Sequence, residues 1–372
     1  MSGIKTYTVF IAILFSLISS YNCNIKAQSF PSEITLPSYK SGHIQGIAYD
    51  DKNNCMYVSY TTMLVKVDMN GRVLGSVTGL LGHLGCLTFN KEEGRVYGSL
   101  EYKDDEIGKG ILKSKNASAL NGSAFYIAIF DVDKITEEDM SAEKDGIMTT
   151  VNLPTVLDDY NADVSFGGNS VKHRFGCSGI DGVSFGPHLN QADDKMYLTV
   201  AYGVYGDVNR TDNDYQVLLQ YDTKKWKKYE RPLSQGNMHR NGPRNPDLTC
   251  FVKTGNTSYG VQNLTFDKNS NLWFMACYAG KKTGYPNYTL FAVDENKPVV
   301  KKPLDGVSYM ETGFVKPFLR GWHYPYGTTG ICPLGNGLFY FTLHNKTEKG
   351  DGGVLKLFKW NGLNDIPFER VE

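Results

Sequence analysis

The sequence lacks an excess of charge of either sign, because 39 basic and 39 acidic residues balance over its 372 residues. Nucleic acids and anionic membranes attract proteins with a basic surplus, so neither is a predicted partner. Beyond the first 20 residues the sequence also lacks an apolar run of membrane-spanning length. We therefore expect a protein without a membrane span that acts as a monomer.

The motifs of several enzyme classes are missing as well. The sequence has no H-E-x-x-H, no G-x-x-x-x-G-K-[ST] and no G-x-S-x-G, which disfavours zincin proteolysis, P-loop nucleotide hydrolysis and α/β-hydrolase chemistry. No cysteine pair has the C-x-x-C spacing of a metal site, and four of six later cysteines lie in apolar, strand-like segments. Buried free thiols are the favoured interpretation, with disulfides as the alternative. The six are Cys55, Cys86, Cys177, Cys250, Cys277 and Cys332.

The N-terminal segment has the pattern of a secretory signal peptide. One lysine, Lys5, precedes an apolar run of roughly a dozen residues, which is too short for a membrane span. Small Ala27 suits cleavage, so we expect a signal peptide over residues 1–27 and one domain over 28–372. The protein is predicted to be secreted, extracellular or periplasmic. Tyr21 and Asn22 are unsuited to precede a lipidated cysteine, so no lipid anchor is expected at Cys23.

What the sequence has in abundance is tyrosine and glycine, with 24 and 39 residues, and few helix-forming runs, which indicates an all-β fold. Five segments begin alike: "GIAYD" (46–50), "CLTFN" (86–90), "GVSFG" (182–186), "NLTFD" (263–267) and "GICPL" (330–334). Each is followed by a short polar turn and then by two further segments with period-2 alternation, which is the pattern of β-strands. The repeat predicts blades of antiparallel strands.

A fourth strand for each blade completes the prediction of a five-bladed β-propeller. "VLGSVTG" (73–79), "MTTVNLP" (148–154), "KYERPL" (228–233) and "VVKKPL" (299–304) follow the third strands of blades one to four. The fifth blade has none, but "SEITLP" (32–37) precedes the first repeat and resembles residues 149–154. An N-terminal strand that completes the last blade would close the ring and remove open edges. A six-bladed ring that uses residues 249–255 is the alternative.

Long insertions and most histidines are predicted on one face of this ring, where a rigid scaffold carries functional loops. His43 and His83 each precede an innermost strand by three residues, so both are expected at the rim of the central channel. The rim residues expected to bind a ligand lie at equivalent positions of the repeat. They are Gln45, Tyr60, Glu101, Tyr102, Ser178, Tyr202, Tyr259, Gln262, Tyr278, Trp322 and His344.

A ring of tyrosine, histidine, amide and carboxylate groups suits a hydroxylated small molecule or an oligosaccharide, since aromatic faces stack on sugar rings and polar groups bind hydroxyls. Elimination on a uronic acid would need a cation for the carboxylate and groups that move two protons. The candidate catalytic residues are His43, His83, His173, Arg174, Asp181, His323 and Tyr326. Hydrolysis by a carboxylate pair fits less well, with Glu101 and Asp181 as the available pair. A non-catalytic propeller that binds a glycan or a protein is a second hypothesis.

The segment "DVNRTDND" (207–214) offers alternating oxygen ligands that suit Ca²⁺. They are Asp207, Asn209, Asp212 and Asp214. The alternative is an Asx-rich turn formed by the same residues, because the segment lacks the glycine and the distal glutamate of an EF-hand loop. Calcium is thus the one cofactor considered, and a Ca²⁺-dependent phosphoester or lactone hydrolase is a third hypothesis.

The run "HIQGIAYD…MYVSY…LVKVD" resembles the blade rhythm of NHL-type and lactonase-type propellers over most of the mature chain. The resemblance implies a propeller fold. Lactonase-type propellers bind a divalent metal through a glutamate that opens an E-G-P stretch and through Asn and Asp at the channel. Gln45-Gly46-Ile47 stands in that place here, which disfavours the metal-dependent lactone hydrolysis of that family.

Overall fold

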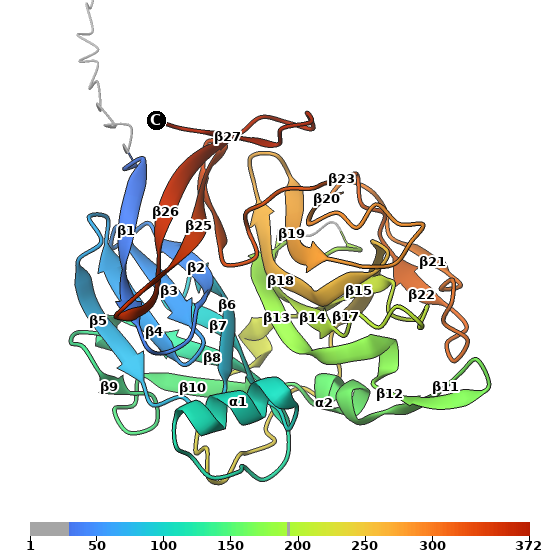
Figure 1. Ribbon diagram of the computed structural model, residues 1–372, viewed down its shortest axis with the longest axis horizontal. Helices are drawn as coiled ribbons and strands as arrows, with labels where there is room; N and C mark the ends of the chain where they lie inside the picture. The colour runs from blue at the N-terminus through green and yellow to red at the C-terminus, as the bar shows by residue number, and fades with distance from the viewer. Residues whose placement is uncertain (1–29, 192–193) are drawn as a thin grey trace, which may run out of the picture. The chain divides into compact units, whose positions relative to one another are not determined.

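The predicted repeat forms five mainly antiparallel sheets arranged as the blades of a β-propeller (Figure 1). The computed structural model describes residues 30–191 and 194–372, and Pro31–Glu372 is one compact unit. The predicted signal peptide and Cys23 lie outside the described residues. Within them, no helix is long and apolar enough to cross a membrane.

Each blade has four main strands, and the innermost strand comes first in the chain. Blade one contains β2 (Ile44–Asp50), β3 (Cys55–Tyr60), β4 (Met63–Asp68) and β5 (Val73–Thr78), with β9 (Met140–Ser141) at its edge. Blade two contains β6 (His83–Asn90), β7 (Arg95–Tyr102), β8 (Ala124–Asp131) and β10 (Met148–Asn152), with β16 (Arg231–Pro232) at its edge. Blade three contains β13 (Cys177–Gly186), β14 (Tyr197–Val204), β15 (Tyr215–Tyr221) and β17 (Leu248–Lys253), followed by β22 (Gly313–Val315) and β21 (Val300–Lys302).

Blade four contains β18 (Thr257–Asp267), β19 (Leu272–Ala279), β20 (Leu290–Asp294) and β23 (Arg320–Trp322). Blade five contains β24 (Ile331–Gly335), β25 (Leu338–Thr347), β26 (Gly350–Trp360) and β1 (Glu33–Tyr39), with β27 (Phe368–Arg370) also paired to β26. The insertions carry the helices α1 (Glu106–Ser114) and α2 (Pro154–Asn161) and the hairpin of β11 (Asp163–Phe166) and β12 (Asn169–Lys172).

The N-terminal strand closes the ring as predicted. β1 pairs antiparallel with β26, with Glu33 opposite Lys356 and Thr35 opposite Val354. The last blade therefore combines strands from both ends of the described chain, which satisfies the open edge of β26.

Two predicted fourth strands are wrong, and so is the six-bladed alternative. Residues 231–232 pair with β10 of blade two, and residues 300–302 join the blade-three sheet through β22. The true fourth strands are β17, which the six-bladed alternative used as an extra strand, and β23. The misplaced segments are exposed, whereas Cys250, Phe251 and Val252 of β17 are buried. Exposed outer strands bury few side chains, so their sequence does not specify which blade they join.

The middle of the channel is filled by tight contacts between inner strands. Gly46 packs so closely on blade two that an added Cβ would lie 2.7 Å from the Cys86 Cα. The Cys86 thiol lies 3.4 Å from the Val183 carbonyl oxygen of blade three. Asn263 of blade four donates hydrogen bonds to the carbonyls of Gln45 and Thr328, at 2.8 and 3.1 Å. The channel thus has two separate mouths.

The six cysteines of the described chain are free and buried, in agreement with the favoured prediction. They take part in the packing of the blades as small apolar side chains.

Candidate functional site

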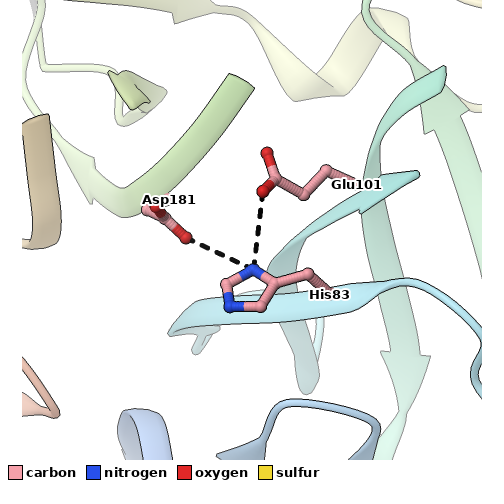
Figure 2. Close-up of side chains that lie close together, drawn as sticks. All are labelled: His83, Glu101 and Asp181. Atoms are coloured by element: carbon pink, nitrogen blue, oxygen red, sulfur yellow. Dashed lines mark ion pairs between the residues drawn. The ribbon is translucent and has the colours of Figure 1, made fainter. Parts of the chain in front are cut away.

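The mouth at which the inner strands begin, which we call the loop-side mouth, gathers titratable side chains around His83. His83 opens β6 and lies directly opposite Glu101 of β7 in the strand pairing. Asp181 comes from β13 of the next blade. The His83 Nδ1 atom lies 3.6 Å from Glu101 Oε1 and 3.5 Å from Asp181 Oδ1, and Figure 2 shows both carboxylates pointing at it.

Hydrogen bonds fix the second oxygen of each carboxylate. The Ile180 backbone N–H donates to Glu101 Oε2 at 3.0 Å, and the Gln262 amide donates to Asp181 Oδ2 at 3.1 Å. Gly179 has a φ of +124°, and an added Cβ there would lie 2.0 Å from Glu101 Oε2. Only glycine allows the blade-three backbone to approach the Glu101 carboxylate this closely.

Lys103 is the functional residue that the sequence analysis missed. Its ammonium lies 2.5 Å from Glu101 Oε1 and 3.7 Å from Asp105, and it donates to the Ser178 carbonyl at 3.0 Å. The side chains of Lys103 and Glu101 are only 5% and 2% exposed. Residues two apart on an extended segment share a face, so the letters E-Y-K at 101–103 contain the signal.

Burial and mutual repulsion shift the ionisation of this group, which we call the His83 cluster (His83, Glu101, Lys103 and Asp181). Burial, with Lys103 and His43 nearby, lowers the pKa of His83 to about 3, so its imidazole is neutral. Burial raises the pKa of Glu101, and burial together with the Glu101 charge raises the pKa of Asp181 well above its usual range. Burial alone would lower the pKa of Lys103, but the surrounding carboxylates raise it above its ordinary value.

The other sides of the loop-side mouth carry histidines and tyrosines. In blade five, His344 Nε2 lies 2.9 Å from Asp351 Oδ1, and the His344 ring lies 6.0 Å from the ring of His43. Gln45 bonds to His43 at 3.1 Å. In blade four, Tyr259 and Tyr278 are in edge-to-face contact at 6.3 Å, and Gln262 also donates to the Tyr259 carbonyl.

Three predicted tyrosines have hydroxyls that bond inside the protein. Tyr60 donates to the Pro37 carbonyl at 2.5 Å, Tyr102 to Gln235 at 2.9 Å and Tyr202 to Asp159 at 2.8 Å. All three are buried between or within blades. In blade two, Glu101 faces His83 and its neighbour Tyr102 takes the opposite side, because successive strand residues alternate.

His173 lies in a different hollow of about 390 Å³, which is also lined by Asp104, Asp105, Tyr160, Asn161, Lys172 and Tyr205. His173 Nδ1 lies 2.5 Å from the Tyr160 carbonyl oxygen. Arg174 donates to Asp159 at 2.6 Å. The Arg174 guanidinium therefore forms an ion pair with Asp159 of α2 and is not part of the His83 cluster.

The remaining aromatic candidates of blade four lie away from the His83 cluster. The Trp322 indole N–H donates to the Asn364 carbonyl at 2.7 Å, and His323 packs on Tyr288 with ring centres 5.1 Å apart. Tyr326 packs on Phe358 of blade five, 5.5 Å between ring centres.

In the predicted calcium segment, two of the four oxygen ligands have cationic partners of their own. Asp212 pairs with Arg210 at 2.7 Å, and Asp214 pairs with Lys282 at 2.5 Å. The Asn209 N–H donates to Asp207 Oδ1, as in an Asx turn. Within the described residues, the His, Cys, Asp and Glu side chains placed to share one metal ion are His83, Glu101 and Asp181, whose ligand atoms lie within 4.8 Å of one another.

Two solved structures align with most of this chain at low sequence identity and low TM-score. The apo form of the soluble aldose sugar dehydrogenase from Escherichia coli is 11% identical with a TM-score of 0.38, covering 87% of this chain and 98% of that one. The β-propeller domain of Cps50 (Swd1) from Myceliophteria thermophila is 10% identical with a TM-score of 0.30, covering 87% and 99%. No protein-family model and no curated protein matches the sequence. Likenesses this distant carry no information about the function of this chain.

Proposed function

We propose that the loop-side mouth binds a hydroxylated small molecule, carbohydrate in class, and that the protein is an exported enzyme. The observation that carries this proposal is the convergence of polar side chains from all five blades above a filled channel. A ligand would be held at the mouth, because the contacts of Gly46, Cys86 and Asn263 leave it no way through. Tyr259 and Tyr278 offer stacking faces, and the imidazole, amide and carboxylate groups bind hydroxyls.

Elimination on a uronic acid is the reaction that these groups support best. The His344 imidazole, oriented by the Asp351 carboxylate 2.9 Å away, has the arrangement of a general base. Once His344 has taken the α-proton, the imidazolium so formed would return that proton to the leaving oxygen. Burial lowers the pKa of the facing His43, so its imidazole is neutral. Hydrolysis by the Glu101–Asp181 pair is less well supported, because Glu101 is buried and both of its oxygens are bonded.

The test is to incubate the protein with a panel of uronic-acid oligosaccharides and to follow the absorbance of unsaturated products. His344→Asn is expected to lower kcat by about 100-fold or more while the substrate still raises the melting temperature. His323→Asn, an exposed histidine on the outer part of blade four, is the control and should leave both readouts unchanged. If no oligosaccharide is cleaved and none raises the melting temperature, the proposal is wrong.

A binding propeller without catalysis is the second candidate function. It is favoured by the internal hydrogen bonds of the Tyr60, Tyr102 and Tyr202 hydroxyls, which leave these groups no role at a reacting atom. Thermal stabilisation by a sugar without any turnover would support this function over elimination.

A further inference from the structure

We propose that His83 Nδ1, Glu101 Oε1 and Asp181 Oδ1 form a binding site for one divalent transition-metal ion, zinc or manganese in class. The site goes beyond the proposed function, because it holds a metal whether or not a sugar is the substrate. It is also distinct from the Asp-rich segment at 207–214.

The distances within the cluster are the first argument. At 3.6 and 3.5 Å, the contacts from His83 Nδ1 to the two carboxylates are longer than hydrogen bonds, which have N···O distances of about 2.7–3.2 Å. Two atoms that each lie about 2.1 Å from one tetrahedral metal ion are roughly 3.4 Å apart. The spacing of the nitrogen from each oxygen is therefore that of ligands around a shared ion.

The second argument is the state of the His83 nitrogen. Nδ1 is buried and has no hydrogen-bond partner, which is a costly condition for a polar atom. A neutral imidazole carries a lone pair on one nitrogen and is the most frequent protein ligand of transition metals. A metal ion between the three groups would give this nitrogen its missing partner.

The third argument is the balance of buried charge. Glu101, Asp181 and neighbouring Asp105 are opposed by a single ammonium, that of Lys103. The two carboxyl groups that face His83 therefore share one cationic partner, and buried carboxylates are stabilised by a paired cation or a bound metal ion. A divalent cation between them would add a second partner.

Lys103 leaves room for the ion. A carboxylate oxygen accepts more than one partner, so Glu101 Oε1 can face the metal while the ammonium stays on its other side. The Ile180 N–H and the Gln262 amide hold the outer oxygens of the two carboxylates, which is the support that metal ligands usually receive. The ammonium and the metal ion repel each other, so Lys103 sets an upper limit on the affinity.

The experiment uses the full protein, dialysed against a chelator and titrated with Zn²⁺, Mn²⁺, Ca²⁺ and Mg²⁺ by calorimetry, with no sugar present. Wild type is expected to bind one equivalent of Zn²⁺ or Mn²⁺. His83→Ala and Asp181→Asn should weaken that binding by about 100-fold or more. His239→Ala is the matched control and should retain the binding, because the His239 imidazole bonds to Thr150 of blade two outside the cluster.

Lys103→Met gives an independent readout, because removal of the ammonium should tighten metal binding while loss of a ligand weakens it. Circular dichroism confirms that each variant is folded. The proposal is overturned if folded wild type binds neither Zn²⁺ nor Mn²⁺, if His83→Ala binds as wild type does, or if binding is lost in Asp214→Asn instead. The absence of metal binding would not affect the oligosaccharide assay, because that assay tests the role of His344. The two proposals can therefore fail independently of each other.

Discussion

The two mouths of the channel are built from opposite ends of the same five strands, yet their chemistry is opposite. The loop-side mouth carries the His83 cluster and the His344–Asp351 pair. The other end, which we call the turn-side mouth, has a hollow of about 200 Å³ lined by Tyr49, Phe89, Phe185, Phe266 and Pro333 among others. These five residues occupy one position of the repeat, the fourth letter of each inner-strand segment.

The comparison shows where the repeat determines structure and where it does not. At the turn-side mouth the five blades contribute four aromatic residues and one proline from the same position of the repeat, and these side chains line one hollow. At the loop-side mouth the polar side chains vary between blades, although His43 and His83 share one position of the repeat, so packing alone does not account for the set. Departures from the repeat are therefore the better guide to function.

The largest expected effect comes from removing the only ammonium of the His83 cluster. Lys103→Met leaves the Glu101 carboxylate buried without its partner, which should lower the free energy of unfolding by about 3–5 kcal/mol. Urea denaturation without added metal measures it. The double variant Lys103→Met/Glu101→Gln should recover part of the loss, since both members of the pair are then uncharged. Equal stability of the single and double variants would contradict the assignment of the pair.

A smaller loss of stability is expected from a substitution at Gly46, in the filled middle of the channel that separates the two mouths. Gly46→Val would place a Cβ 2.7 Å from the Cys86 Cα, in backbone that cannot move without shifting a blade. Overpacking of this kind should cost about 1–3 kcal/mol in thermal unfolding. Gly110→Ala on α1, where an added Cβ meets nothing within 4 Å, is the control and should stabilise by about 0.5–1 kcal/mol. If Gly46→Val leaves the stability to thermal unfolding unchanged, the channel is open at this position.

The smallest effect concerns Asp159 on α2, at the periphery of the loop side. Burial raises its pKa, although Tyr202 and Arg174 partly oppose this. An acid with a raised pKa in the folded protein favours folding when protonated. Its contribution is therefore present below the unfolded pKa of about 3.9 and is lost as pH rises through the folded pKa. Asp159→Asn should flatten this part of the stability–pH curve, measured by urea unfolding, and an unchanged slope would contradict the shift.

The inner parts of the fold could be predicted from sequence because alternation, aromatic residues and turns agree there. The closure by residues 32–37 could be predicted for the same reason. The outer strands could not be predicted, because Arg231 and Lys301 are exposed. Neither buries surface that would specify which of two neighbouring blades its strand joins. In the site, the position of His83 followed from the repeat. Lys103 was missed although it lies two residues after Glu101, because β7 ends at Tyr102 and its extended continuation had to be seen before the two side chains could be placed on one face.

The pairing of β1 with β26 has a consequence for how the polypeptide acquires its shape. The Tyr340 hydroxyl donates to the Pro31 carbonyl across 309 positions of sequence, so this junction forms only after nearly the whole chain is available. Contacts of such long range carry a large closure entropy and form slowly. During synthesis, the strand at 33–39 must wait unpaired for its partner, and blade five is expected to gain protection from hydrogen exchange last.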